Sequence, residues 1–129
     1  MFLDTSVIIE VFRRRNDPEF LQRVERIVGD GELFVSIVQL AEVADWAVRN
    51  KLPPKERVAA VKEFARVVPL DERICLDAAE TKAGRREKGY VDFSLLDGVV
   101  LASARSIGQR LMTLDGDFAG EADCHVERF

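Results

Sequence analysis

Short apolar runs alternate with longer stretches of helical periodicity along the whole chain. The runs have the length of buried β-strands and occupy residues 1–3, 33–35, 67–70 and 110–114, with a fifth short strand expected near residues 125–126. Between the first two runs, Leu21, Val24, Ile27 and Val28 recur at the spacing that places them on one face of a helix. Strands that alternate with helices are typical of a parallel sheet, so the pattern predicts an α/β fold.

Helix starts are marked by side chains that accept hydrogen bonds from free backbone N–H groups. Asp17 stands before Pro18, and Ser36 stands three residues before Gln39, which is the spacing of a capping box. Pro69 lies in the third apolar run, and because proline cannot donate to a neighbouring strand, that strand is expected at a sheet edge. The helices are predicted at about residues 6–14, 17–28, 36–48, 54–65, 71–88 and 94–108.

Composition narrows the class of protein. The 129 residues suit one domain, and 47% hydrophobic with 33% charged residues is typical of a folded chain. No apolar run in the sequence approaches the roughly 18 residues of a membrane span, and no signal peptide is recognised, so a cytoplasmic protein is expected. Cys75 and Cys124 are expected to be reduced, and a single histidine leaves little for zinc binding or histidine acid–base chemistry.

Four acids fall where the predicted strands and helices meet. Asp4 ends the first strand, and Asp115 ends the fourth. Glu42 lies near the start of the helix after the second strand, and Asp97 lies in the first turn of the helix that leads into the fourth. The carboxyl end of a strand and the start of the next helix share one side of a parallel α/β sheet. All four acids are therefore expected at the sheet edge where such folds bind ligands.

Each acid also has a simpler interpretation. Asp4 can cap the following helix, and Glu42 can be a solvated helix residue. Asp97 stands three residues after a serine, which is a capping box in itself, and Asp115 precedes a glycine as in an ordinary turn. Taken one at a time, these acids do not require a ligand.

Taken together, the acids favour a metal site. Asp97 precedes the apolar residues 98–102, and Asp4 lies between two apolar segments, so burial of both is expected. Two carboxylates about 5 Å apart repel by roughly 3 kcal/mol at an effective dielectric constant near 20. One or two hard divalent ions would relieve this repulsion, and Mg²⁺ suits oxygen ligands, with Mn²⁺ as a substitute. The net charge of −4 argues against nucleic-acid binding, but bound cations would offset it locally.

Four segments resemble the PIN-domain nucleases, and their order and spacing are similar to those of VapC-type toxins from prokaryotic toxin–antitoxin pairs. The segments are FLDTSVII at residues 2–9, QLAEV at 39–43, LLDGVVLASA at 95–104 and LMTLDGDF at 111–118. Each segment alone is a weak signal, whereas four of them in order, spanning nearly the whole chain, are fairly specific.

The resemblance implies a fold, an activity and roles for particular residues. The fold is a three-layer α/β/α sandwich with a short parallel sheet of four to five strands, and residues 1–129 form a single PIN-like nuclease domain. The activity is endoribonuclease cleavage of RNA that depends on Mg²⁺ or Mn²⁺. The implied catalytic and metal-binding residues are Asp4, Glu42, Asp97 and Asp115, with Asp117 as an alternative or auxiliary ligand; Thr5, Ser6 and Thr113 support them by hydrogen bonding.

The resemblance also implies partners, namely an RNA substrate, a small antitoxin protein and a second copy of the chain in a homodimer. The apolar helices at residues 40–48 and 58–64 are the expected docking groove, with Trp46 as an anchor or, alternatively, as an ordinary packing residue. The candidate cations for gripping RNA phosphates are Arg13, Arg14, Arg15, Arg85 and Arg86. Their simpler interpretation is as solvated cations at helix C-termini.

Other functions remain open at this point. The main alternative is a non-catalytic or phosphoryl-accepting α/β domain with an acidic metal site. Enzymes that form an aspartyl phosphate place a second aspartate two residues after the first, and position 6 is serine here. That departure favours the nuclease interpretation.

Overall fold

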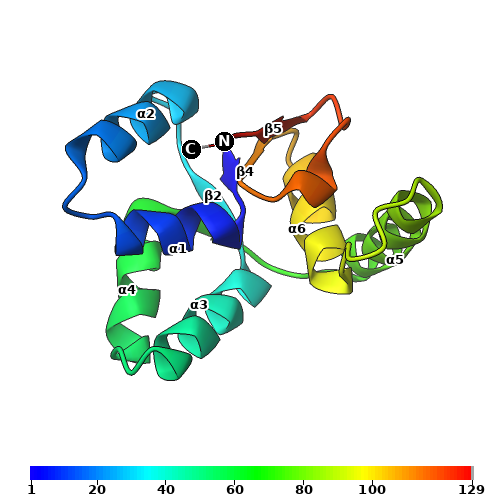
Figure 1. Cartoon of the computed structure of the whole chain (residues 1–129). Coiled ribbons are helices and arrows are strands. Elements are labelled where there is room, and N and C mark those ends of the chain that lie inside the picture. Colours follow the sequence, from blue (N-terminus) through cyan, green and yellow to red (C-terminus); the bar gives the residue numbers. More distant parts are fainter. Residues whose placement is uncertain (129) are drawn as a thin grey trace.

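Five short parallel strands run through the centre of the molecule in the order β3-β2-β1-β4-β5 (Figure 1). The structure is a computed structural model that describes residues 1–128. The strands are β1 (Phe2–Leu3), β2 (Phe34–Ser36), β3 (Arg66–Val68), β4 (Leu111–Thr113) and β5 (Cys124–Val126). The predicted parallel sheet is confirmed, with β3 and β5 at its two edges.

Within residues 1–128, six helices and one 3₁₀ turn connect the strands, and most begin at the capping residue that the sequence marks. They are α1 (Thr5–Arg13), α2 (Pro18–Val28), α3 (Ile37–Arg49), α4 (Pro54–Phe64), α5 (Glu72–Glu87), α6 (Leu95–Ser106) and η1 (Gly116–Phe118). Asp17 accepts a hydrogen bond from the Phe20 amide. Ser36 and Gln39 form a complete capping box. The predicted helix positions are thus confirmed to within a few residues.

Successive residues along each strand point to opposite faces of the sheet, so apolar side chains on both faces can pack against helices. The sheet therefore has a helical layer on each side. Leu3 and Met112 pack with α1–α4 on one face, whereas Phe2 and Leu111 pack with α6 on the other. Figure 1 shows α1–α4 on one side of the strands and α5 and α6 on the other. This is the predicted three-layer arrangement, and it leaves the carboxyl ends of the strands free to form a site.

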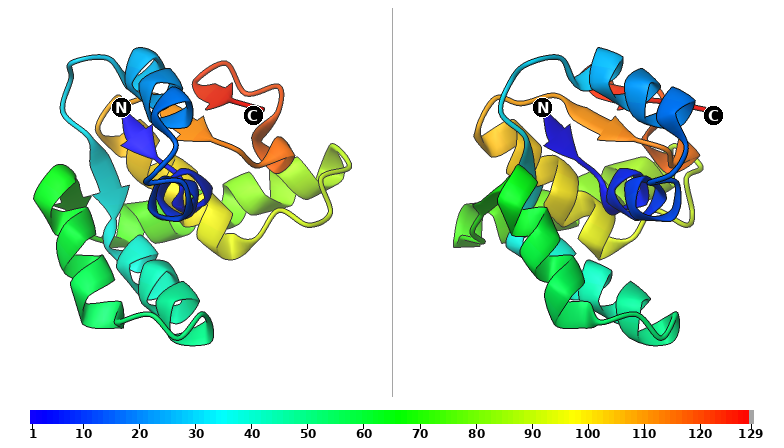
Figure 2. Two further views of the ribbon diagram at one scale, coloured as in Figure 1. Left: turned by 60° about the vertical axis from the view of Figure 1, so that its left-hand side comes forward. Right: turned by 90° about the vertical axis from the view of Figure 1, so that its left-hand side faces the viewer.

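Helix α5 packs on α6 rather than on the sheet, and Figure 2 shows the two helices lying side by side. Their backbones approach closely at Gly98, where a Cβ atom would lie only 2.5 Å from the carbonyl oxygen of Ala78. A side chain of any size at this position would therefore force the helices apart. Because Gly98 directly follows Asp97, this contact also fixes the backbone beside one of the candidate ligands.

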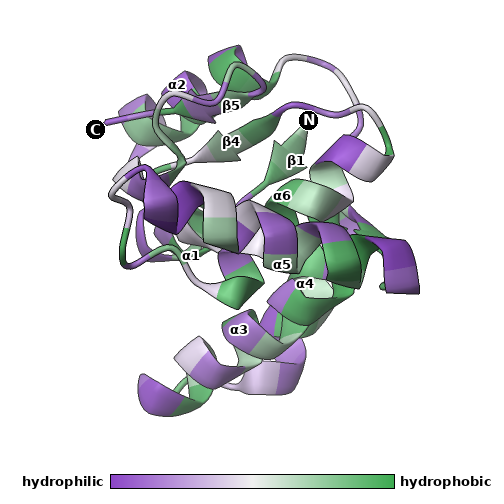
Figure 3. Cartoon of the chain, turned by 90° about the vertical axis from the view of Figure 1, so that its right-hand side faces the viewer, coloured by the Kyte–Doolittle hydropathy of each residue, from purple (hydrophilic) through white to green (hydrophobic). Residues whose placement is uncertain are grey.

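The hydropathy pattern follows these layers. In Figure 3, β1 is hydrophobic, whereas the surface helices mix hydrophobic with hydrophilic residues. Across residues 1–128, no helix combines the length and the apolar character that crossing a membrane requires.

Candidate metal centre

The candidate acids come from four separate segments and meet at the carboxyl ends of β1 and β4. Asp4 follows β1 as the N-cap residue of α1, and Asp115 follows β4 as the N-cap residue of η1. Carboxylate oxygens of Asp97, Asp115 and Asp117 all lie within 4.8 Å of one another. The charges of Asp4 and Asp97 are near enough to Glu42 to raise the pKa of its carboxyl. The sheet edge therefore gathers the acids as the topology predicts.

Asp4 is the most deeply buried of these acids, with 6% of its surface exposed. Its Oδ2 atom accepts hydrogen bonds from the hydroxyls of Ser6, at 2.7 Å, and Thr113, at 2.8 Å. Burial raises the pKa of the Asp4 carboxyl, the two hydroxyls oppose that change, and the charge of Asp115 adds to the increase. The two hydroxyls also orient the carboxylate of Asp4. The resemblance implied such a role for Ser6, whereas for Thr113 it implied support of the fourth acid, Asp115.

Ser6 and Thr113 also fasten the two strand ends to each other. The Ser6 hydroxyl accepts a hydrogen bond from the Leu114 amide at 3.0 Å, and the Thr113 hydroxyl accepts one from the Asp115 amide at 3.0 Å. Each hydroxyl therefore donates to Asp4 while it accepts from the backbone that carries Asp115. The separation of Asp4 from Asp115 is fixed by this pair of bridges.

Glu42 lies on α3 and is half-buried. Its Oε1 atom accepts a hydrogen bond from the Thr5 hydroxyl at 2.8 Å. Burial raises the pKa of the Glu42 carboxyl most, the Thr5 hydrogen bond opposes this, and the charges of Asp4 and Asp97 raise it further. Thr5 therefore orients Glu42 in the same way that Ser6 and Thr113 orient Asp4.

Asp97 has two roles that the sequence left as alternatives. Its Oδ2 atom accepts a hydrogen bond from the Ser94 amide at 2.8 Å, so the capping box at the start of α6 is real. Burial raises the pKa of the Asp97 carboxyl, the Ser94 amide opposes this, and the charges of Asp4 and Asp115 add to the increase. The residue therefore caps α6 and belongs to the acidic cluster at once.

The turn after β4 supplies two acids instead of one. The Asp115 carboxylate accepts a hydrogen bond from the Asp117 amide at 2.9 Å, which closes the 3₁₀ turn. Partial burial raises the pKa of the Asp117 carboxyl, the charges of Asp115 and Asp92 raise it further, and the charge of Arg85 opposes the increase. Both acids of the turn thus face the cluster. Asp92 is a neighbouring charge that the sequence analysis did not identify.

Gln39 holds the Thr5 hydroxyl in place and was missed as a site residue. It is fully buried, its Oε1 atom accepts from the Ser36 amide at 2.7 Å, and its Nε2 atom donates to the Leu3 carbonyl at 2.7 Å. The same Nε2 atom donates to the Thr5 hydroxyl at 3.2 Å. Gln39 therefore links β1, β2 and α3 and leaves the Thr5 hydroxyl directed at Glu42. The sequence indicated only its capping role; a polar residue on the inner face of α3 was the missed signal.

Replacing Gln39 with leucine is expected to lower the free energy of unfolding by about 2–3 kcal/mol, because it leaves buried donors and acceptors without partners. Urea denaturation measures this change. Gln22 is exposed on α2, so Gln22→Leu is the matched control and is expected to change stability by less than about 0.5 kcal/mol. Equal stability of Gln39→Leu and the unsubstituted protein would show that this network is not needed for folding.

The chemistry of the donor set fits a hard divalent cation. All the candidate ligands are carboxylate oxygens, which Mg²⁺ and Mn²⁺ prefer. Within residues 1–128, no lysine or arginine forms an ion pair with the carboxylate of any acid in the cluster. The acids compared are Asp4, Glu42, Asp97, Asp115 and Asp117. Carboxylates that are partly buried together without an ion-pair partner repel one another, and binding of a metal cation would relieve that repulsion.

Removal of one charge is therefore expected to stabilise the metal-free protein. In buffer with a chelator, Asp97→Asn is expected to raise the melting temperature by roughly 2 °C, which corresponds to about 0.5 kcal/mol. Asparagine can still accept the hydrogen bond from the Ser94 amide, while repulsion from Asp4 and Asp115 disappears. Loss of favourable helix-dipole interaction opposes the gain.

Differential scanning calorimetry checks this expectation. Asp71 is the matched control, because it accepts a hydrogen bond from the Ile74 amide at the start of α5 and is exposed. Asp71→Asn is expected to leave the melting temperature unchanged within about 1 °C, since asparagine is as good an N-cap. A clear decrease for Asp97→Asn would mean that the charged cap outweighs the repulsion.

The arginines proposed to grip RNA differ in their surroundings. Arg13 and Arg14 are exposed and both form ion pairs with Glu10, while Arg15 is exposed. Arg86 is exposed and donates to the carbonyl of Phe93. These four stay candidates for RNA contact.

Arg85 requires a correction. Its side chain is 3% exposed, and its guanidinium donates to the backbone carbonyls of Asp117 and Ala119 and to Glu121. A guanidinium that is buried with its donors used cannot reach an RNA phosphate. The expectation that Arg85 binds RNA is wrong.

Surfaces near the acids are concave and partly apolar. One cleft of about 470 Å³ lies between α1, α3 and α6 and is lined in part by Thr5, Glu42 and Leu96. The ring of Trp46 stacks on Phe12 with centroids 6.0 Å apart, so Trp46 helps to pack α3 against α1. This contact supports the packing interpretation of Trp46, and its role as an anchor for a partner stays a prediction.

Comparisons with known proteins bear on the family and the fold of the chain. The family model of the PIN domain matches residues 1–121. A search of curated proteins finds no match. A toxin-antitoxin complex from Klebsiella pneumoniae contains a chain with a TM-score of 0.74 and 19% identity, over 97% of this chain and 95% of that chain.

Two further solved structures have the same fold. VapBC2 from Rickettsia felis, bound to a DNA fragment from its promoter, gives a TM-score of 0.72 at 13% identity, over 99% of this chain and 97% of that chain. DNA-bound VapBC from Salmonella typhimurium gives a TM-score of 0.70 at 21% identity, over 98% of this chain and 95% of that chain. The predicted PIN-like α/β fold is thus confirmed.

Proposed function

This chain belongs to the PIN domain family, and we propose that it is a metal-dependent endoribonuclease of the VapC type that acts as the toxin of a toxin–antitoxin pair. The observation that carries the proposal is the meeting of the acids at one sheet edge, where, among residues 1–128, none of their carboxylates forms an ion pair with arginine or lysine. The family is one of nucleases, which supports the assignment to hydrolases. The fold shared with VapBC structures supports the toxin assignment.

Asp4, Glu42, Asp97 and Asp115 are the proposed ligands, and Asp117 is a further candidate because it belongs to the same oxygen cluster as Asp97 and Asp115. When bound there, Mg²⁺ or Mn²⁺ supplies Lewis-acid stabilisation of phosphate charge and makes water a better nucleophile. Ser6 and Thr113 hold the Asp4 carboxylate in one orientation, and Thr5 holds Glu42. A site that is oriented in advance loses less free energy when substrate and metal bind.

The phosphoryl-accepting alternative fits the geometry less well. An acceptor aspartate has to reach the phosphorus atom, whereas Asp4 is nearly buried and its Oδ2 atom accepts two hydroxyl hydrogen bonds. Ser6 donates to Asp4 instead of supplying a second carboxylate. A radioactive phosphodonor distinguishes the alternatives, because the nuclease proposal predicts no labelled protein.

The remaining features of the proposed function concern partners and location. The solved structures of similar fold are toxin–antitoxin complexes, which supports a small antitoxin protein as the physiological partner. We further propose that residues 1–129 act as one nuclease domain, that the chain forms a homodimer, and that it works on RNA in the cytoplasm.

The test is RNA cleavage by the purified protein in the presence of Mg²⁺, of EDTA, and of EDTA followed by excess Mn²⁺. The proposal predicts cleavage with Mg²⁺, loss of cleavage with EDTA, and recovery with Mn²⁺. A circular RNA substrate has no ends for an exonuclease, so its conversion to linear products identifies endonuclease activity. Cleavage that continues in EDTA, or an absence of cleavage with saturating Mg²⁺, would overturn the proposal.

A further inference from the structure

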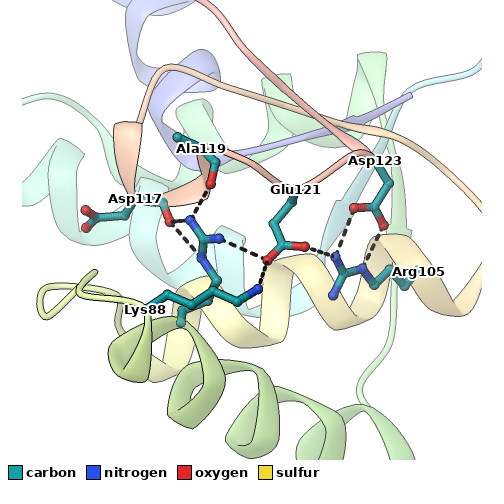
Figure 4. Close-up of polar contacts among 7 residues, drawn as sticks. Lys88, Arg105, Asp117, Ala119, Glu121 and Asp123 are labelled. Carbon is teal, nitrogen blue, oxygen red and sulfur yellow. Dashed lines mark hydrogen bonds and ion pairs between the residues drawn. The ribbon is translucent and has the colours of Figure 1, made fainter.

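Arg85 has a buried guanidinium that lies beside the turn carrying Asp115 and Asp117. The guanidinium donates to the Asp117 carbonyl at 2.5 and 3.1 Å and to the Ala119 carbonyl at 2.7 Å. It also forms an ion pair with Glu121 at 2.9 Å. Figure 4 shows the contacts with Asp117, Ala119 and Glu121 converging on one side chain. Four donor contacts from one residue therefore reach three successive points of this loop.

The aromatic residues around Arg85 hold it in that position. The guanidinium carbon lies 3.9 Å from the centre of the Tyr90 ring and 5.9 Å from that of Phe93. The Tyr90 amide also donates to the backbone carbonyl of Arg85 at 3.1 Å. Removing a charged side chain from water costs several kcal/mol of folding free energy. A protein with an apolar residue of similar volume in place of a buried ion pair is often equally stable. A role in fixing the loop explains why a cation occupies the position.

Arg85 supplies hydrogen-bond partners that the helical turn lacks. The last carbonyls of a helical turn lack partners in the turn itself, and the Asp117 and Ala119 carbonyls receive theirs from Arg85. The ring of Phe118, between them, packs against Phe93 with centroids 5.2 Å apart. These two contacts hold the end of the turn, and the Thr113 hydroxyl holds its start.

Arg85 also connects the loop to Asp97 through the close packing of α5 on α6. Arg85 belongs to α5, and α5 packs on α6 so closely that a Cβ at Gly98 would lie 2.5 Å from the Ala78 carbonyl oxygen. Asp97 immediately precedes Gly98. A loop fixed to α5 is therefore also fixed relative to Asp97, whose oxygens lie within 4.8 Å of those of Asp115 and Asp117.

We propose that Arg85 is a positioning residue that holds the Asp115–Asp117 turn against Asp97, so that affinity for a divalent cation depends on this buried guanidinium. The proposal rests on the proposed function, because it takes the acidic cluster to be a metal site. Arg85 contacts neither the cation nor the RNA in this account. It acts only by keeping the carboxylates of the turn within reach of Asp97.

The test is Mn²⁺ affinity, measured from the electron paramagnetic resonance signal of free Mn²⁺ during titration of the whole chain. Arg85→Ala is expected to weaken the Kd for Mn²⁺ by at least about tenfold, as is typical when a residue that orients metal ligands is removed. Millimolar guanidinium is expected to restore much of the affinity by filling the vacated position. An equal concentration of urea, which lacks the charge, is expected to restore none.

Arg105→Ala is the matched control. Arg105 also forms an ion pair with Glu121, at 3.1 Å, but its other partner is Asp123 rather than the carbonyls of the turn. The control is expected to change the Kd by less than about twofold. If Arg85→Ala does not fold, Arg85→Lys takes its place, because lysine keeps the charge but cannot reproduce the planar fork of donors.

Four outcomes are distinct. A weaker Kd that guanidinium restores, with an unchanged Arg105→Ala, supports the proposal. An unchanged Kd in Arg85→Ala or Arg85→Lys overturns it while the proposed function stands. A Kd weakened equally in Arg105→Ala, without rescue, also overturns it and indicates general destabilisation. If the unsubstituted protein binds no Mn²⁺ and cleaves no RNA, the proposed function fails, and the positioning role fails with it.

Discussion

Asp4→Asn is expected to slow RNA cleavage by at least about 100-fold at saturating Mg²⁺, a loss typical of removing one charge from a preorganised site. Asparagine has nearly the same shape, and its carbonyl oxygen can accept the hydrogen bonds from Ser6 and Thr113. The substitution therefore removes the charge and largely preserves the geometry. Single-turnover cleavage of a labelled RNA measures the effect, with circular dichroism to verify folding.

Asp77→Asn is the control for this substitution. Asp77 is an exposed aspartate on α5, and its nearest ion-pair partner is Arg73 at 3.9 Å. Its replacement is expected to leave the cleavage rate within about twofold, since exposed ion pairs contribute little. If folded Asp4→Asn cleaves RNA within tenfold of the unsubstituted rate, Asp4 does not have the proposed role.

Gly98→Ala is expected to lower the free energy of unfolding by about 2–3 kcal/mol, the size typical of overpacking in a core. The added Cβ meets the Ala78 carbonyl oxygen, a backbone atom that cannot turn away as a side chain would. Alanine favours a helix over glycine by about 1 kcal/mol, so the substitution is destabilising only because the steric clash is larger. Chemical denaturation measures the difference.

Gly84→Ala separates these two effects. Gly84 lies inside α5, and a Cβ at this position has nothing within 4 Å. Only the gain in helix propensity remains, so Gly84→Ala is expected to stabilise the protein by about 0.5–1 kcal/mol. If Gly98→Ala were as stable as Gly84→Ala, α5 and α6 would not be fixed to each other as the packing indicates.

The sequence predicted the fold and the candidate acids because both depend on short-range patterns. Asp17 and Ser36 mark helix starts through hydrogen bonds to the next turn, and the structure confirms both. Asp4 and Asp115 each follow a buried strand, and parallel strands end at the same edge of a sheet. Topology alone therefore brought these acids together. Their role as metal ligands stays a prediction until a cation is observed.

Contacts between distant segments limited the sequence prediction. Arg85 and Asp117 are 32 residues apart, and near the end of α5 an arginine fits the helix dipole as well as it fits any other role. Gln39 looked like a capping residue because its bond to Ser36 is local, while its bond to Leu3 spans 36 residues. Patterns within one helix do not show such partners. The roles of both residues could be recognised only from the three-dimensional arrangement of the strands and helices.

The two acids of the β4 turn illustrate the same limit at shorter range. From the sequence, Asp117 was either an alternative to Asp115 as the fourth ligand or an auxiliary ligand beside it. The 3₁₀ turn closes through a hydrogen bond from the Asp117 amide to the Asp115 carboxylate, and oxygens of both residues lie within 4.8 Å of an Asp97 oxygen. The choice between them depends on how a cation orders these oxygens, and no sequence pattern contains that information.

Anomalous X-ray diffraction from a crystal soaked in Mn²⁺ tests most directly whether these separated carboxylates form one cation site. The expected result is an anomalous peak among Asp4, Asp97 and Asp115, at coordination distance from their oxygens, which disappears in Asp97→Asn at the same Mn²⁺ concentration. A fully soaked crystal with no peak at this edge of the sheet, or with peaks only at unrelated surface acids, would contradict the proposed metal site and the nuclease function built on it.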